Sequence, residues 1–324
     1  MTAFEAFVEW QDRLRRDRPD AIQLGETRIA RALGAIRPEV PAPQQTTIHR
    51  CDLARAWCAR RGMPAAWSAR ALVCEGVRHA LALLLAQLDA PVGLPRDVYP
   101  IYAQIAGRAG IATLEFATFP ELDLERVWAS GARHVVLPCP LKLHGRAWTD
   151  DELAAAARWL AAAEDRRLVL DGVYSFGQPL GSGVLALIET GQVIYLDSMS
   201  KGWLHEQVFG TAVVPARDLA RLAPVFRAAP PSQARLAAAA SLLETATPDR
   251  VDAELATLRT RTIAVLAARG LVAPLPVRGY LVPVACSAER ALADHGVVAI
   301  PLDVFGGEPG GWSFASALSL AGAA

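Results

Sequence analysis

The sequence predicts an α/β protein: a three-layer α/β/α domain with a mostly parallel sheet, followed by a smaller α/β C-terminal domain. The chain has 324 residues, about twice the length of a typical domain, which favours a large unit with a smaller one appended. From about Cys51 onward, short apolar segments alternate with helical segments, which is typical of parallel sheets covered by helices. Hydrophobic residues make up 52% of the chain, enough to fill a sizeable core.

The expected elements lead from an N-terminal arm into two domains. The arm covers residues 1–45, with an amphipathic helix to about residue 20 and then an extended stretch punctuated by proline. The large domain covers 46–246, with helices expected at 51–61, 77–88, 102–109, 150–163 and 231–243 and strands at 111–116, 134–139, 167–171, 193–197 and 210–214. The small domain covers 247–324, with a helix at 249–269 and strand candidates at 278–284 and 297–300.

Local signals support individual elements. Phe4 and Phe7 lie on the apolar stripe of the first helix. Thr149 followed by Glu152 predicts an N-terminal cap for the alanine-rich helix at 150–163. That helix leads into the strand that ends at Asp171, so an acidic residue is expected at the carboxyl end of a strand.

Composition and charge exclude several classes of partner. Basic and acidic residues both number 33, so no net positive charge is available to attract nucleic acid or an anionic membrane. The longest apolar run, Ala80 to Ala86, is too short to cross a bilayer, and the acidic start does not resemble a signal peptide. Five cysteines without paired spacing indicate a reduced, cytoplasmic protein, and we expect no metal site.

Lysine is nearly absent from the chain. Only two of the 33 basic residues are lysines, Lys142 and Lys201. A desolvated ammonium can lose its proton, whereas a guanidinium effectively cannot. We therefore expect the retained lysines to mark amine chemistry.

Three short motifs lie where a parallel sheet places its ligands. An apolar strand from Val193 runs into two serines and then Lys201, and the preceding strand ends at Asp171 with Tyr174 three residues later. In open α/β sheets, ligands bind outside the carboxyl ends of the strands. Gly76 opens an apolar helix, where backbone N–H groups and the helix dipole can hold a phosphate.

In this order, the motifs resemble the fold type I pyridoxal-phosphate (PLP) enzymes, specifically the class I/II aminotransferase family, over roughly residues 45–320. Asp171-Gly-Val-Tyr174 matches the family's Asp-x-x-Tyr, and Ser198-Met-Ser-Lys201 matches its Ser-x-Ser-Lys, the most specific of these motifs. The stretch 137–153 is similar to the family's Asn-Pro-Thr-Gly loop and the helix after it. The resemblance implies the PLP-transferase fold and PLP as the cofactor.

The resemblance also implies roles for individual residues. Lys201 would form the covalent imine and move the substrate's α-proton, and Asp171 would keep the pyridine nitrogen protonated. Tyr174 would donate to the ring oxygen, and Tyr99 would stack on the ring face. The remaining implied cofactor-binding residues are Gly76, Val77, Arg78, Lys142, Ser198 and Ser200. From the residues alone, a turn-capping Asp171, an ordinary turn glycine at 76 and a half-buried Tyr99 stay open as alternatives.

The chain departs from the family's pattern near the ring and near the phosphate. Lys142 stands where the family has the loop asparagine, and would either donate to the ring oxygen or be an exposed loop lysine. The phosphate-binding arginine after the catalytic lysine is missing, because Val208 or Phe209 occupies its place. Arg78 or His205 would have to compensate.

A further departure affects the substrate. Gly311-Trp-Ser-Phe-Ala315 keeps the frame of the family's Arg-x-Ser-Phe-Ala but lacks the arginine that binds the substrate's α-carboxylate. Either another arginine such as Arg278 takes over, or the substrate is not recognised through an α-carboxylate. Because the arginine is missing, we expect alanine, aspartate and glutamate to be poor substrates. We also expect the pocket near Trp203 and Trp312 to select something bulkier, or an amine without an α-carboxylate.

These observations together predict a PLP-dependent, aminotransferase-like enzyme acting through a Lys201 Schiff base. Its substrate would be an amine or unusual amino acid of small-molecule, including secondary, metabolism, and the protein would be a homodimer. Two alternatives remain: a PLP-dependent decarboxylase, eliminase or cyclase on the same scaffold, and a non-catalytic homologue. Retention of Lys201, Asp171 and Tyr174 opposes the non-catalytic alternative.

Overall fold

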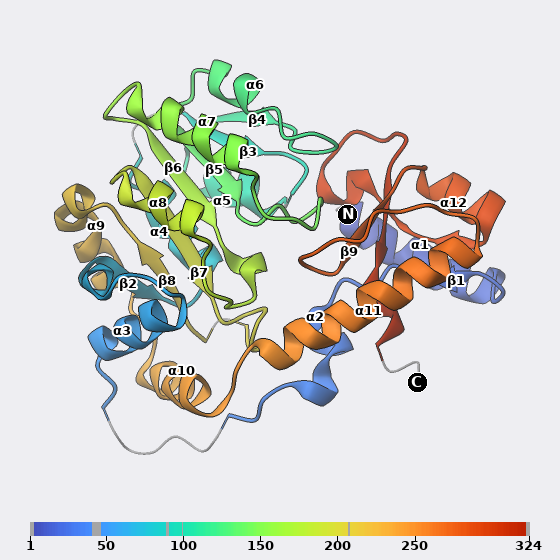
Figure 1. The fold of residues 1–324 in the computed structure, drawn as a ribbon, viewed down its shortest axis with the longest axis horizontal. Helices are drawn as coiled ribbons and strands as arrows, with labels where there is room; N and C mark the ends of the chain where they lie inside the picture. The colour runs from blue at the N-terminus through green and yellow to red at the C-terminus, as the bar shows by residue number, and fades with distance from the viewer. Residues whose placement is uncertain (1–2, 41–46, 89–90, 99, 207, 322–324) are drawn as a thin grey trace.

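The computed structural model shows a large α/β part joined to a smaller mixed part (Figure 1). It describes residues 3–40, 47–88, 91–98, 100–206 and 208–321. The large part contains one seven-stranded sheet, and the smaller part contains a three-stranded sheet and a two-stranded pair. The predicted fold class, a mostly parallel sheet between helices with a smaller second part, is confirmed. The exact domain boundaries stay a prediction.

The large sheet has the strand order β2-β8-β7-β6-β5-β3-β4. Strands β4, β3, β5, β6 and β7 pair in parallel, whereas β8 is antiparallel to both of its neighbours. The strand bounds are β2 Ala71–Cys74, β3 Val92–Pro95, β4 Thr113–Phe116, β5 His134–Pro138, β6 Arg167–Asp171, β7 Val193–Ser198 and β8 Gly210–Val213. In register, Asp171 lies between Pro138 of β5 and Leu196 of β7, so the ends of these three strands meet at one edge.

Helices cover both faces of this sheet. One face packs against α3 (Arg50–Arg60), α6 (Leu124–Ala129), α7 (Asp150–Ala161), α8 (Ser182–Glu189) and α10 (Gln233–Thr245). The other packs against α4 (Val77–Leu85), α5 (Ile101–Arg108) and α9 (Ala216–Ala228). The expected cap of α7 forms as a capping box between Thr149 and Glu152. Each of these helices therefore contributes buried apolar side chains to one of the two cores.

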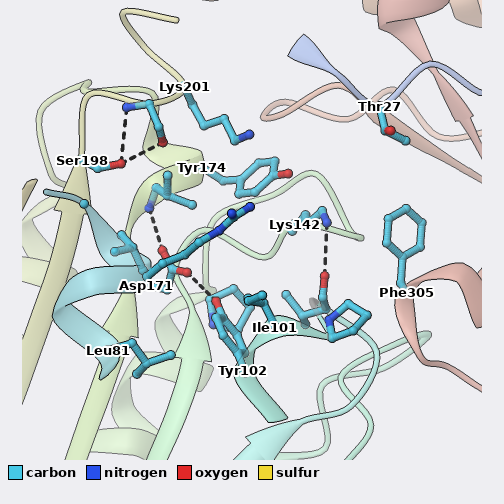
Figure 2. Close-up of a pocket in the computed structure, with 18 of the residues that line it drawn as sticks. Thr27, Leu81, Ile101, Tyr102, Lys142, Asp171, Tyr174, Ser198, Lys201 and Phe305 are labelled. Carbon is cyan, nitrogen blue, oxygen red and sulfur yellow. Dashed lines mark hydrogen bonds between the residues drawn. The ribbon is translucent and has the colours of Figure 1, made fainter. Parts of the chain in front are cut away.

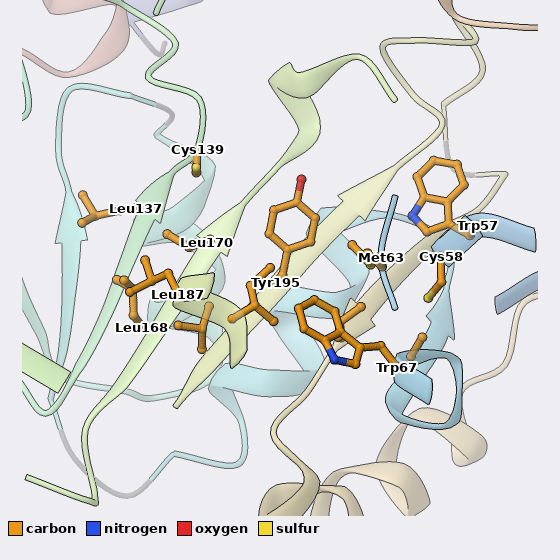
Figure 3. Close-up of a cluster of buried hydrophobic side chains, with 14 of the residues drawn as sticks. Trp57, Cys58, Met63, Trp67, Leu137, Cys139, Leu168, Leu170, Leu187 and Tyr195 are labelled. Atoms are coloured by element: carbon orange, nitrogen blue, oxygen red, sulfur yellow. The ribbon is translucent and has the colours of Figure 1, made fainter. Parts of the chain in front are cut away.

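The alternation of side chains along the strands separates the two cores. Leu168 and Leu170 of β6 pack with the first group of helices, whereas Val169 packs with the second. Successive side chains of a strand point to opposite faces, so one continuous apolar run serves both cores. Figure 3 shows the first core, where Tyr195 of β7 lies among leucines and tryptophans.

The smaller part combines the C-terminal chain with the N-terminal arm. The 20-residue helix α11 (Asp249–Ala268) leads into it, and the sheet has the order β11-β12-β9. In the arm, β1 (Ile22–Gln23) pairs in parallel with β10 (Val297–Val298). The remaining elements are α1 (Ala3–Asp17), α2 (Ile29–Ala32), β9 (Leu281–Val284), α12 (Ala288–His295), β11 (Ile300–Pro301), the 3-10 helix η4 (Leu302–Phe305) and β12 (Ser313–Ser316).

Several elements differ from the sequence-based expectations. The arm beyond residue 20 is not simply extended, because it contains β1, α2 and the 3-10 helix Gly34–Ile36. Helix α9 was not expected, and it carries Pro224 in its interior. Proline normally interrupts a helix, but packing of Leu222 and Phe226 against the sheet holds this one. Strands β2 and β3, each four residues long, were also missed.

Candidate functional site

A cavity of about 700 Å³ lies at the edge where β5, β6 and β7 end. Its walls include Pro138, Asp171 and Ser198, the last residues of these three strands. Every predicted site residue that the structure describes lines this one cavity: Gly76, Val77, Arg78, Lys142, Asp171, Tyr174, Ser198, Ser200 and Lys201. Tyr99, the predicted stacking residue, lies outside the described residues.

Gly76 forms a turn at one end of the cavity. Its φ of 146° is unfavourable for residues with a side chain, and it is the N-cap of α4. The helical ladder begins where the amide of Ala80 donates to the Gly76 carbonyl, so the preceding amides are directed out of the helix end. A Cβ on Gly210 would lie 2.6 Å from the Gly76 Cα, which brings β8 close beneath this turn.

Two serine hydroxyls face the same turn. Ser198 Oγ and Ser200 Oγ are 2.8 Å apart, and the Ser200 amide donates to Ser198 Oγ. A Cβ on Gly76 would contact the Ser198 Cβ at 3.7 Å. Backbone amides, a helix N-terminus and two hydroxyls are donors that suit a phosphate group.

Asp171 is a buried carboxylate on the cavity wall. Tyr102 of α5 donates its hydroxyl to Oδ2, and the Val173 amide donates to Oδ1 at 3.0 Å. Burial raises the pKa of Asp171, while these donors and the ammonium groups of Lys142 and Lys201 act in the opposite direction. Asp171 thus caps its turn and also faces the cavity, where a cationic group would stabilise its charge.

Lys201 and Tyr174 lie together above Asp171 in Figure 2, and all three line the cavity. The Lys201 Nζ is 6.0 Å from the centre of the Tyr174 ring. Burial lowers the pKa of Lys201, which increases the neutral, nucleophilic fraction of its amine. The Tyr174 hydroxyl is 3.1 Å from the hydroxyl of Tyr280, which in turn donates to the carbonyl of Thr27.

Lys142 is buried in the cavity wall and is not the exposed loop lysine that the sequence left open. Its Nζ donates to the Val98 carbonyl at 3.1 Å and lies 4.6 Å and 5.5 Å from the ring centres of Phe305 and Tyr174. Burial and the positive charge of Lys201 lower its pKa to about 7. Both lysines of the chain therefore face one cavity.

Beneath the cavity, a fully buried guanidinium joins two of its walls. Arg61 Nε lies 2.6 Å from Asp197 Oδ2, and Nη2 donates to Tyr195 Oη at 2.8 Å and to Ser175 Oγ at 2.6 Å. Asp197 precedes Ser198, and Ser175 follows Tyr174. Arg61 thus supports the turn that carries Ser198 and the turn that carries Tyr174.

Four residues considered as compensating or specificity groups lie elsewhere. Arg278 lies 3.6 Å from Asp252 of α11, and His205 contacts the Arg37 side chain and a backbone carbonyl. Trp203 is fully buried in the first core, where its indole N–H donates to the Ala246 carbonyl. Trp312 packs edge-on against Phe119. None of Arg278, His205, Trp203 and Trp312 lines the cavity, so the expectation that the two tryptophans select a bulky substrate is wrong.

The sequence analysis missed other residues of the cavity, above all Tyr102, Tyr280 and Phe305. The chain has only five tyrosines, and Tyr102, Tyr174 and Tyr280 all line this cavity. Scarcity alone does not separate them from Tyr195, which lies in the first core. Phe305 lies in η4, far from the motifs in sequence, and no local signal points to it.

The chain has an α/β fold with a cavity at the carboxyl ends of parallel strands, and its fold is similar to that of solved aminotransferase structures. A double mutant of Thermus thermophilus aspartate aminotransferase has a TM-score of 0.73 and 21% identity, over 98% of this chain and 92% of that chain. A Mycobacterium tuberculosis aminotransferase has a TM-score of 0.69 and 22% identity, over 97% and 91%.

A PLP-bound C-S lyase from Staphylococcus hominis is also similar, with a TM-score of 0.70 and 15% identity over 90% of this chain and 79% of that chain. No protein-family model matches the sequence, and no curated protein matches it. These likenesses confirm the predicted fold class. Among the described residues, no helix has the length and apolarity to span a membrane, and no group of three or more His, Cys, Asp or Glu side chains is placed to bind a metal ion.

Proposed function

We propose that this chain is a PLP-dependent, aminotransferase-like enzyme that acts on an amine or amino acid and uses Lys201 as its covalent residue. One observation carries the proposal. In a chain with the aminotransferase fold, the only two lysines, a buried strand-end carboxylate, a phenol and a phosphate-type turn face a single cavity. The Gly76 turn, the Asp171–Tyr174 motif and the Ser198–Lys201 motif, which are separate in the sequence, thus line the same cavity.

The cavity suits the cofactor at both of its ends. At one end, the Gly76 turn, the start of α4 and the hydroxyls of Ser198 and Ser200 would hold the phosphate. At the other, the buried Asp171 carboxylate would accept a hydrogen bond from a cationic ring nitrogen, which would also favour its ionised form. Val77, Arg78 and Tyr99 complete the proposed cofactor contacts.

When bound, PLP would supply an aldehyde carbon for covalent attachment and a ring that withdraws electrons. Lys201 would provide the amine for that attachment and, once released by a substrate amine, would carry a proton to or from the substrate carbon, because burial keeps part of its amine neutral. Tyr174 and Lys142 would donate to the ring oxygen, since both lie on the same side of the cavity. Asp171 would accept a hydrogen bond from the ring nitrogen and so keep that nitrogen protonated.

Transamination is the reaction that we propose first, in small-molecule metabolism that includes secondary metabolism. Elimination is the second candidate, because a C-S lyase has the same fold. We also propose a cytoplasmic homodimer, with the cavity at the subunit interface.

The proposal is tested by cofactor reconstitution. The purified chain mixed with PLP should develop the visible absorbance of a pyridoxal imine, and borohydride should remove that band. Peptide mapping by mass spectrometry should then locate the reduced pyridoxyl group on Lys201. A chain that binds no PLP, or that carries the adduct at its N-terminus alone, would contradict the proposal.

A further inference from the structure

We propose that Arg28 receives a carboxylate group of the substrate, so that the substrate is an amino acid with an apolar side chain. The inference rests on the proposed function and deepens it. Arg28 takes the role that the sequence analysis offered to Arg278, because Arg278 is paired with Asp252 outside the cavity. At Gly311, where the family frame has its arginine, a Cβ would meet nothing within 4 Å, so no part of the described chain fills that place.

Arg28 lies at the end of the cavity formed by the small part and the arm. It is the N-cap of the short helix α2, and it lines the cavity together with Thr27. A chain of contacts connects this end to the candidate site: the Tyr280 hydroxyl donates to the Thr27 carbonyl at 3.2 Å and lies 3.1 Å from the Tyr174 hydroxyl. Arg28 is therefore attached to the same framework as Tyr174.

Glu26 orients the Arg28 guanidinium. Its Oε1 accepts from the Arg28 amide at 2.8 Å and from Arg28 Nε at 3.3 Å. The Glu26 amide donates to Ser319 Oγ, which ties this turn to the C-terminal chain. Because the Glu26 contact uses Nε, the two terminal nitrogens keep the fork geometry that binds a carboxylate through two hydrogen bonds.

The other arginine of the described cavity wall serves the opposite end. Among the residues that the structure describes, the arginines that line the cavity are Arg28 and Arg78. Arg78 is in the first turn of α4, beside the Gly76 turn that would hold the phosphate. Arg28 is left as the guanidinium for a substrate carboxylate.

The walls around Arg28 favour an apolar remainder of the substrate. Ile29, Val304 and Phe305 line the cavity on this side, and Phe4 of α1 also contributes. Asp303 lines the same region, so a second carboxylate on the substrate would be repelled. A single carboxylate with an apolar side chain fits this set of groups.

The experiment compares Arg28→Gln with a matched control, Arg31→Gln, in the PLP-loaded chain. Arg31 lies in the same short helix but does not line the cavity. Phenylalanine and phenethylamine differ only in the carboxylate, and their dissociation constants can be measured from the change in cofactor absorbance. We expect the unmodified protein and Arg31→Gln to bind phenylalanine about 10- to 100-fold more tightly than phenethylamine. Arg28→Gln should remove that preference without weakening phenethylamine binding.

A second measurement does not depend on reaction with the cofactor. Calorimetric titration with 3-phenylpropionate, which has the carboxylate but no amine, should show binding that Arg28→Gln abolishes and Arg28→Lys partly retains. An unchanged preference in Arg28→Gln, or an equal loss in Arg31→Gln, would overturn the inference. Absence of the imine band in the unmodified protein would instead reject the proposed function, so the two failures are distinguishable.

Discussion

The two ends of the cavity are built in different ways. At the cofactor end, Asp171 and Ser198 are the last residues of β6 and β7, and these hydrogen-bonded strands hold them in register. At the substrate end, Arg28, Tyr280 and Phe305 come from the arm, the region before β9 and η4, which lie far apart in the sequence. The proposed cofactor end keeps motifs that resemble those of the aminotransferase family, whereas the proposed substrate end lacks that family's carboxylate-binding arginine.

This difference shows which part of the site is free to change. A strand-end residue cannot shift without disturbing a sheet that is buried on both faces. A residue on a short arm segment can be exchanged at little cost to the fold, because loops carry function with fewer packing constraints. We therefore expect changes at the cofactor end to affect all substrates and changes at the substrate end to affect selectivity.

The largest effect is expected for Lys201→Ala. No other described residue places an amine in the same position after β7, so the borohydride-trapped adduct should disappear and turnover should fall by about 10⁴-fold or more. Lys201→Arg should be equally inactive, because a guanidinium does not lose its proton. An adduct trapped on Lys142 in Lys201→Ala would show that the covalent residue was misassigned.

Asp171→Asn should separate cofactor binding from chemistry. A neutral amide no longer stabilises a cationic ring nitrogen, so turnover should fall by about 10³-fold while the cofactor stays bound. Asp97 supplies a control, since it is also buried and bonds the amides of Thr118 and Phe119 without lining the cavity. Asp97→Asn should lower thermal stability and leave the cofactor's absorbance unchanged; equal turnover in Asp171→Asn and the unmodified protein would contradict the assignment.

Arg61→Met tests the support beneath the cofactor end. The change leaves Asp197 buried without its ion-pair partner, which should reduce the free energy of unfolding by about 3–5 kcal/mol. Arg55→Met in α3, the helix whose C-cap is Arg61, breaks only an exposed pair with Asp52 and should change the free energy of unfolding by less than about 1 kcal/mol. Denaturant unfolding measures both, and comparable losses in the two variants would show that the buried contacts of Arg61 are not special.

The smallest effect concerns Lys142 and pH. Its pKa is lowered from 10.5 to about 7 by burial, with a contribution from Lys201 and an opposing one from Asp171. Between those two pH values the unfolded chain binds more protons than the folded chain, so the stability of the cofactor-free protein rises with pH in this window. Lys142→Met removes that dependence. The Lys142→Met variant should melt at a higher temperature than the unmodified protein, and this difference should be largest near or below about pH 7 and shrink towards about pH 10. A difference that is constant with pH would contradict a buried amine at this position.

Much of the fold followed from the sequence because its signals are local. The capping residues Thr149 and Glu152 and the apolar runs before Asp171 and Lys201 predicted α7, β6 and β7 with bounds within two residues. The missed elements are those whose stability comes from packing. Strands β2 and β3 are held by pairing with their neighbours in the large sheet, and α9 persists despite Pro224 because one side is buried.

By itself, the sequence determined the fold class, and it predicted residues that the structure brings to one cavity at the proposed cofactor end. Motifs at the ends of parallel strands can be expected to lie close together, because parallel strands bring their carboxyl ends to one edge of the sheet. The two lysines stood out because the sequence has no others. Only the tertiary structure decided that Lys142 is buried, that Trp203 belongs to the core and that Arg28 shares a cavity with Lys201. Those facts depend on how the arm and the C-terminal part fold back onto the large sheet, and contacts between segments hundreds of residues apart leave no periodic or spacing signal in a single chain.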